Sequence, residues 1–260
     1  MAAGSLIVAR KELLDHLRDT RSIMSMTVHA LMGPGVVMLV SFSGAARGDA
    51  LSTILVSMMS VFALVSSFAG GMNIALDATA GEYERRSMLP LLMNSVAIRD
   101  VVLGKWMTTS LFTVGALFIN IAGVCLVLTT RAPALLTAHG LGLMQWVAFG
   151  LLPLALLGAA VELLVASNAR STKEASTWLT IVAFLPMLAG IVLVFFPGRL
   201  GHWWCVMPVI GQQVLIGKSL SGQSASLLYV IVLAVVTAAA SAPVLTSATR
   251  VIGRAERLSR

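Results

Sequence analysis

The chain has 260 residues, of which 58% are hydrophobic and only 11% are charged, and its mean hydropathy is +0.92. Because soluble globular domains carry about 25% charged residues, this composition excludes an ordinary water-soluble protein. The net charge of +7 is explained by the Lys and Arg excess that membrane proteins keep on their cytoplasmic side, so no nucleic-acid partner is expected.

Residues 1–22 predict an amphipathic helix ahead of the first apolar stretch. In helical projection its leucines share one stripe: Leu6, Leu13, Leu14 and Leu17. The charged side chains of Lys11, Asp15 and Arg18 point away from that stripe. We therefore expect an elbow helix that lies in the membrane interface, with its leucines in the acyl boundary.

Six later stretches are long and apolar enough to cross a bilayer as helices, which takes about 20 residues each. They cover residues 23–43, 51–76, 106–128, 143–167, 177–198 and 225–247. Since barrel strands are only about 9–11 residues long, the sequence predicts an all-α polytopic membrane protein. The six-span bundle over 23–247 and a basic tail over 248–260 complete a single domain.

The Lys and Arg residues divide unequally between the two sides that six spans define. Fourteen lie on the side of both termini: Arg10, Lys11, Arg18, Arg21, Arg85, Arg86, Arg99, Lys105, Arg170, Lys173, Arg250, Arg254, Arg257 and Arg260. Four lie on the opposite side: Arg47, Arg131, Arg199 and Lys218. Because cytoplasmic segments carry the Lys and Arg excess, both termini are expected in the cytoplasm.

The densest charge lies in the predicted cytoplasmic loop Asp77–Lys105, yet the centre of this loop is apolar. Its apolar residues are Met88, Leu89, Leu91, Leu92 and Met93, and they are flanked by Glu82, Glu84, Arg85 and Arg86. A loop that meets only water has no reason to carry such side chains, whereas a short helix that docks into a partner's groove does. The alternative is a second interfacial helix that lies on lipid.

Glu162 is a carboxylate within the predicted fourth span. Placing a charged group in a membrane helix costs several kcal/mol, so Glu162 is a functional candidate that faces protein or a water-filled path. The alternative is a side chain that snorkels to the inner face or pairs there with Arg170 or Lys173.

Taken in chain order, these segments resemble ABC transporter permeases of the type-2 exporter class (the ABC-2 family). The central likeness is ALDATAGEYERRSMLPLLMNSVAIRDVVLGKW, which holds the box Gly81–Arg85, a coupling helix over Ser87–Leu92 and an Arg-to-Gly-Lys motif over Arg99–Lys105. KELLDHLRDTRSI is similar to the connecting helix that opens these permeases, and SNARSTKEAST is similar to their loop after span four. VMPVIGQQVLIGKSLSG resembles the outer segment of the NatB-like branch, which exports sodium or drugs.

The resemblance implies a transporter subunit rather than an enzyme, in a bacterial plasma membrane. Two permease chains, expected to be identical, would pair, and two cytoplasmic ATPase subunits would dock on their coupling helices. ATP and Mg would bind to that partner ATPase, and this chain would hold no cofactor of its own.

The same resemblance assigns roles to motif residues, to which Glu162 is added from its place in span four. The gate and charge network would contain Glu82, Glu84, Arg85 and Glu162, and the ATPase would contact Met88, Leu89, Leu91, Leu92 and Met93. The elbow helix would be positioned by Lys11, Glu12, Arg18 and Arg21, and a second cytoplasmic contact would come from Lys173 and Glu174.

Two departures from the family pattern count against sodium as the substrate, and the sequence leaves the substrate open among a sodium ion, a drug, a peptide and a lipid-like molecule. Only a few residues, around Gly44–Ala50, connect spans one and two, where NatB-like permeases often carry a large outer domain. In the outer segment Gln212 or Gln213 stands where Asn is usual. Whether Arg199–Ser224 re-enters the membrane is also open.

The sequence also bears on functions other than an exporter. The alternative is a secondary carrier or channel that uses Glu162 as its coupling carboxylate. A glutamate-type intramembrane protease needs paired acids and histidines within spans, whereas Glu82 and Glu84 fall in the predicted loop. GQQVLIGKS has the wrong spacing for a phosphate loop. No metal site is expected, because His139 and His202 are isolated.

Overall fold

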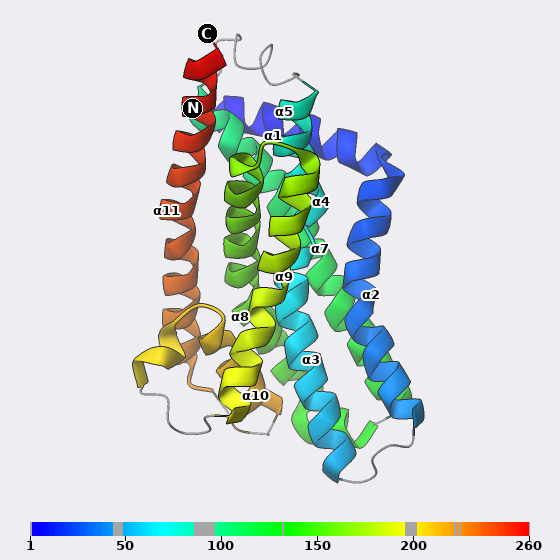
Figure 1. Cartoon of the computed structure of the whole chain (residues 1–260). Helices are drawn as coiled ribbons and strands as arrows, with labels where there is room; N and C mark the ends of the chain where they lie inside the picture. Colours follow the sequence, from blue (N-terminus) through cyan, green and yellow to red (C-terminus); the bar gives the residue numbers. More distant parts are fainter. Residues whose placement is uncertain are drawn as a thin grey trace.

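The computed structural model describes residues 2–43, 49–85, 97–131, 133–195, 202–220, 223 and 225–259. Over these residues the chain is helical and contains no strand, as predicted (Figure 1). The α-helices are α1 (Ala2–Arg18), α2 (Thr20–Ser43), α3 (Asp49–Ala69), α4 (Met72–Leu76), α5 (Glu82–Glu84), α7 (Ile98–Arg131), α8 (Pro133–Asn168), α9 (Thr172–Phe195), α10 (Ile210–Leu220) and α11 (Leu227–Ser259). A π-helix, η1 (Asp77–Gly81), joins α4 to α5, and a 3₁₀ helix, η2 (His202–Val206), precedes α10.

Five helical stretches of the described residues are long and apolar enough to cross a membrane. They are Thr20–Phe42, Ser57–Glu84, Ile98–Arg131, Gly150–Asn168 and Leu227–Arg254. The other predicted span, 177–198, falls on α9, a 24-residue helix that packs against α3 and α8. A multi-pass helical membrane protein is therefore supported, while the count of six spans stays a prediction.

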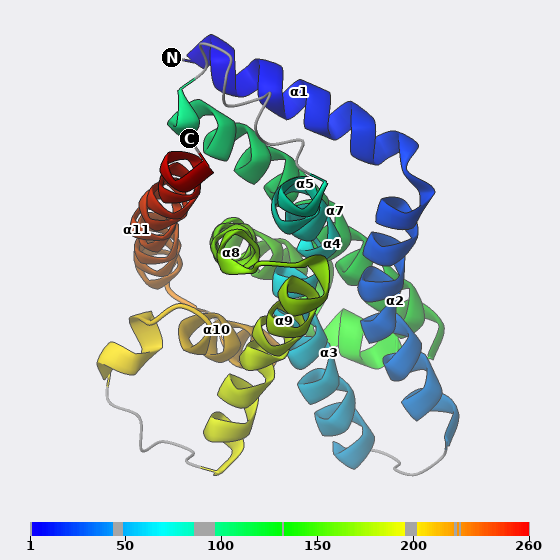
Figure 2. The ribbon, with the colours of Figure 1, turned by 45° about the horizontal axis from the view of Figure 1, so that its top comes forward.

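The bundle is organised around α8, which packs against α7, α11, α3, α10 and α9 (Figure 2). Both chain termini lie at one end of the bundle, which we call the terminal end (Figure 1). Helix α1 lies across this end, and α5 reaches it too, whereas α10 lies at the opposite end (Figures 1 and 2). The segments predicted to be cytoplasmic thus share one end, although the side of the membrane that this end faces stays a prediction.

The centre of the bundle is closed by apolar residues of α3, α7 and α8, among them Leu64, Phe68, Leu117 and Leu154. Small residues bring these helices close, which matters in lipid because helix association there depends on close packing. A Cβ atom on Gly158 of α8 would collide with a backbone carbonyl of α3, so only glycine permits this contact.

The predicted loop Asp77–Lys105 is wrong at both of its ends. Residues 77–84 continue the second span as η1 and α5, and residues 98–105 form the first turns of α7. The physical reason is the row of small side chains at Ala78, Thr79, Ala80 and Gly81, all buried, which lets η1 pack against α8 and α9. The glycine and the charged residues of this stretch are typical of a loop, but the chain stays helical there.

The outer segment is a packed helix rather than a surface loop. Helix α10 contacts α8 and α3. Gln212 is fully buried, where its Oε1 accepts the N–H of Val209 at 2.7 Å and its Nε2 donates to Thr237 Oγ1 of α11 at 2.9 Å. Gln213 Nε2 donates to Ser60 Oγ of α3 at 2.9 Å. These two amides fix α10 to the bundle, while its depth in the membrane stays open.

Candidate functional site

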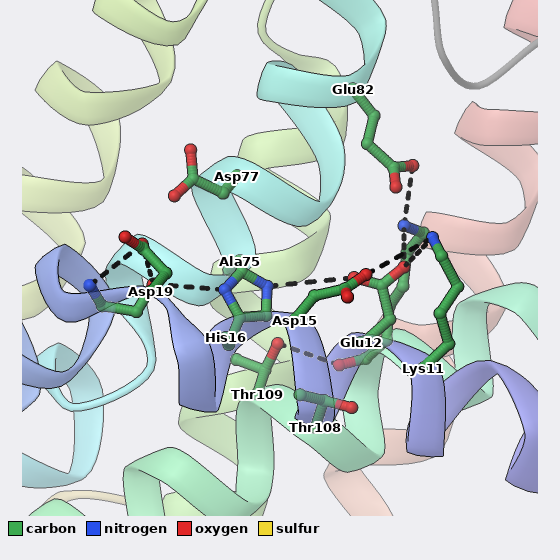
Figure 3. A network of polar contacts seen from close by, with 12 residues as sticks. Lys11, Glu12, Asp15, His16, Asp19, Ala75, Asp77, Glu82, Thr108 and Thr109 are labelled. Carbon is green, nitrogen blue, oxygen red and sulfur yellow. Dashed lines mark hydrogen bonds and ion pairs between the residues drawn. The ribbon is translucent and has the colours of Figure 1, made fainter.

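A buried lysine binds two carboxylates at the terminal end of the bundle. The two carboxylates, Glu12 and Glu82, are labelled in Figure 3. Lys105 of α7 has no exposed surface, and its Nζ lies 3.1 Å from Glu12 Oε1 of α1 and 2.8 Å from Glu82 Oε2 of α5. Lys11 Nζ lies 3.8 Å from the same oxygen of Glu12, so two ammonium groups balance two carboxylates. We call Glu12, Glu82 and Lys105 the charge centre. Removing one member of such a buried set leaves an uncompensated charge, which is strongly destabilising.

Helix α1 reaches Lys105 because the residue before it is glycine. A Cβ atom on Gly104 would lie 2.7 Å from Val8 Cβ and 2.9 Å from the carbonyl oxygen of Ser5, distances too short for real atoms. The Thr108 hydroxyl, one turn along α7, donates to the carbonyl of Ala9 at 3.1 Å. The Gly104-Lys105 pair therefore supplies both the close approach of the two helices and the charge that fixes it.

The face of α1 that packs on α7 is not its leucine stripe. The buried residues of α1 are Ser5, Val8, Glu12 and His16, spaced three or four apart as one helical face. Leu6, Leu14 and Leu17 are 57%, 43% and 51% exposed and so point away from the rest of the chain, whereas Leu13, the fourth leucine of the predicted stripe, is half-buried. This orientation agrees with the predicted leucine stripe, whose contact with lipid stays a prediction.

His16 extends the charge centre towards α2 (Figure 3). Its Nε2 lies 3.8 Å from Glu12 Oε2, and its Nδ1 lies 3.1 Å from Ser22 Oγ. The Ser22 hydroxyl donates to Asp19 Oδ2 at 2.8 Å, and the backbone N–H groups of Arg21 and Ser22 donate to the same carboxylate at 3.2 and 3.1 Å. Asp19 therefore caps the N-terminus of α2. The Ser22 hydroxyl, followed by these N–H groups, lowers the pKa of the Asp19 carboxyl.

Helix α5 is held on its other side by α9. Glu84 Oε2 accepts the N–H of Thr172, the first residue of α9, at 3.0 Å. Arg85 Nη2 lies 3.3 Å from Asp77 Oδ1 within the same segment. The two glutamates of α5 thus act in different directions, because Glu82 binds Lys105 while Glu84 caps α9.

The start of α9 is also capped by its own residues. Ser171 Oγ, at the N-cap, accepts the N–H of Glu174 at 3.2 Å, and Glu174 Oε2 accepts the N–H of Arg170, the residue before the cap, at 3.0 Å. Glu174 therefore has a structural role in the link between α8 and α9. Contact of Lys173 and Glu174 with a partner stays a prediction.

The remaining predicted residues fall into two groups. Arg18, Arg21 and Lys173 are exposed, and within the part of the chain that the structure describes they form no ion pair. The predicted ATPase contact, Met88, Leu89, Leu91, Leu92 and Met93, lies outside the described residues. Along the chain these residues come between α5 and α7, the two elements that the charge centre joins.

Glu162 does not belong to the charge centre. Its side chain has no exposed surface, and neither carboxylate oxygen has a hydrogen-bond partner within the described residues. The alternative of a snorkelling side chain paired with Arg170 or Lys173 is therefore wrong, because neither cation forms an ion pair with Glu162 and the carboxylate does not reach a surface.

Sequence reasoning missed Lys105 and His16 as site residues. Lys105 closes the Arg-to-Gly-Lys motif, so the motif contained the signal, but its two partners lie 93 and 23 residues away. His16 stands four residues after Glu12, on the same helical face, which was a usable signal as well.

Comparison with known proteins gives a partial match. The chain is 34% identical over 138 residues to the "ABC transporter permease protein NatB" of Bacillus subtilis (strain 168). The aligned part covers 51% of this chain and 36% of that protein, so the chain spans about a third of the length of its relative. No protein-family model matches the chain. Together with the apolar helices, this likeness supports a membrane permease of the ABC transporter kind rather than an enzyme.

Proposed function

We propose that the chain is the membrane permease subunit of a type-2 ATP-binding-cassette exporter, close to the NatB-like branch. Two copies would pair in a bacterial plasma membrane with both termini in the cytoplasm. Two separate ATPase subunits would bind ATP and Mg and drive efflux of a small substrate such as a sodium ion, a drug or a peptide. The partial likeness to a permease and the apolar helices support this proposal.

The observation that carries this proposed function is the charge centre. The segment 86–96 holds the apolar residues expected to contact the ATPase, and it is flanked by α5 and α7. Lys105 and Glu82 tie these two flanks to each other, and Glu12 ties them to α1. A displacement of α5 or of the start of α7 would therefore be shared among α1, α5 and α7. A subunit pushed by a partner needs this stiffness.

The partner contact is tested by replacing Leu91 with aspartate. Extraction from the native host in mild detergent should recover the variant inserted in the membrane but without the ATPase, because a charge replaces an apolar contact. Leu91→Met is the matched control, since it keeps the apolar surface and should retain the ATPase. Equal recovery of the ATPase with Leu91→Asp and with the wild-type chain would defeat the proposal that this segment is the coupling helix. The carrier alternative would then gain support if the chain alone transported substrate.

A further inference from the structure

The second span is broken beside the carboxylate of Glu162. Helix α3 ends at Ala69, and α4 begins at Met72, with Gly70 and Gly71 in a turn between them. A Cβ atom on Gly71 would lie 2.9 Å from Glu162 Oε2 and would collide with Thr113 Oγ1. Glycine therefore allows the broken backbone to approach an oxygen of Glu162, an oxygen of Thr113 and the methyl group of Thr109 closely.

The oxygen of Thr113 is free to act as a ligand. Its hydroxyl hydrogen is used, because Thr113 donates to the carbonyl of Thr109 at 2.9 Å. The remaining lone pairs of the oxygen can only accept a hydrogen bond or bind a cation. Thr113 and Thr109 have no exposed surface, so bulk water does not supply that partner.

The break adds backbone oxygens to the same region. A helix that stops interrupts the regular pairing of the carbonyl groups in its last turn, and α3 stops at the residue before this glycine pair. At this break the carbonyl of Ser66 accepts the N–H of Gly70 at 3.2 Å and that of Gly71 accepts the N–H of Ala75 at 2.9 Å, which leaves each of these oxygens one lone pair for a further ligand. The hydroxyl of Ser66, one turn before the break, is also buried and has no hydrogen-bond partner among the residues that the structure describes. Interrupted membrane helices with free carbonyls are a common way to bind small cations near a carboxylate.

The charge balance selects the class of ligand. One carboxylate with neutral oxygens is matched by a single positive charge, whereas calcium sites gather several carboxylates. The described residues contain no cluster of three or more His, Cys, Asp or Glu side chains that could hold a transition metal. Lys105, the nearest buried cation on the stripe that continues through Thr109 to Thr113, is already bound by Glu12 and Glu82.

A proton on Glu162 is the competing occupant of this place. A protonated Glu162 would donate its O–H group to an acceptor such as the Thr113 oxygen, whereas an alkali cation would bind the carboxylate and the Thr113 oxygen together. Only the cation makes the stability of the chain depend on which chloride is present.

We propose that Glu162, Thr113 and the backbone at the Gly70–Gly71 break form a binding site for one monovalent alkali cation inside the bundle. The site is formed where α3, α4, α7 and α8 pack together, so it does not depend on an ATPase partner or on the direction of transport. It is a resident site in the protomer, and the proposal makes no claim about the transported substrate.

The test is thermal unfolding of the whole chain in lipid nanodiscs, followed by circular dichroism. Chlorides of lithium, sodium, potassium, rubidium and caesium are compared with choline chloride at the same ionic strength. Because a ligand that binds only the folded state stabilises it, the best alkali cation should raise the unfolding midpoint by about 5 °C over choline. The rise should saturate with concentration.

Three variants decide the location of the site. Glu162→Gln and Thr113→Val should each lose the difference between alkali cations and choline. Asp15→Asn, the same acid-to-amide change at an exposed position of α1, should keep it. If Glu162→Gln does not fold, Thr113→Val still gives the answer. A wild-type midpoint that is the same in all chlorides, or a full cation response in either site variant, would overturn the proposal.

Discussion

Lys105→Met tests the charge centre. The change keeps a long side chain in a fully buried position and removes the ammonium group that binds Glu12 at 3.1 Å and Glu82 at 2.8 Å. Glu12 and Glu82, with side-chain exposures of only 6% and 15%, would then lose the ammonium group that they share. Breaking a buried ion pair on one side costs about 3–5 kcal/mol, which for a chain of this size lowers the unfolding midpoint by about 10 °C.

The assay compares three forms of the protein in nanodiscs by circular dichroism on heating. The triple variant Glu12→Gln, Glu82→Gln, Lys105→Met should be more stable than Lys105→Met, because it removes the charges together and leaves none unpaired. Lys218→Met is the matched control: this lysine is exposed and lies 5.6 Å from the ring of Tyr229, so its loss should cost about 1 kcal/mol or less. If Lys105→Met unfolds at the wild-type temperature, or if the triple variant is the less stable of the two, the charge centre does not hold these helices together.

Three further changes probe the helices around the site. Gly104→Val should force α1 away from α7, because even a Cβ atom would lie 2.7 Å from Val8; protease cleavage within residues 2–18 should become faster, and an unchanged rate would contradict the close contact. Asp19→Ala should cost about 1 kcal/mol through loss of the α2 cap. Because the pKa of Asp19 is lower in the folded than in the unfolded chain, the wild-type chain should be more stable than Asp19→Ala at a pH above the unfolded pKa. This difference in the free energy of unfolding should fade as the pH falls through the folded-state pKa, and a difference that increases at lower pH would contradict the cap. Arg131→Ala should lower the free energy of unfolding by about 0.5–1 kcal/mol, because the Arg131 guanidinium lies 3.7 Å from the centre of the Phe42 ring. Arg131→Lys keeps the positive charge and should lose less stability. If both variants are as stable as the wild-type chain, the contact does not stabilise the fold.

The helical bundle could be predicted from the sequence because long apolar stretches have few structural options in a membrane. The exposed orientation of Leu6, Leu14 and Leu17 on α1 also followed from helical periodicity. Both depend on near neighbours in the chain, which is why single-sequence reasoning reached them.

The charge centre could be predicted only in part. Glu12 and Glu82 were chosen as site residues from motifs, but their shared partner was not, because it depends on how α1 crosses α7 at Gly104. Glu162 stands out in the sequence as a carboxylate within a span. That it has no hydrogen-bond partner among the described residues follows from three-dimensional packing around the break at Gly71, which periodicity does not encode.

The central claim, that this permease is driven by a separate ATPase, is tested most directly by ATP hydrolysis. The chain is purified from its own host in lipid nanodiscs together with whatever accompanies it. The account predicts vanadate-sensitive hydrolysis carried by a copurified subunit. A well-folded chain that brings no ATPase with it under gentle extraction would contradict the account.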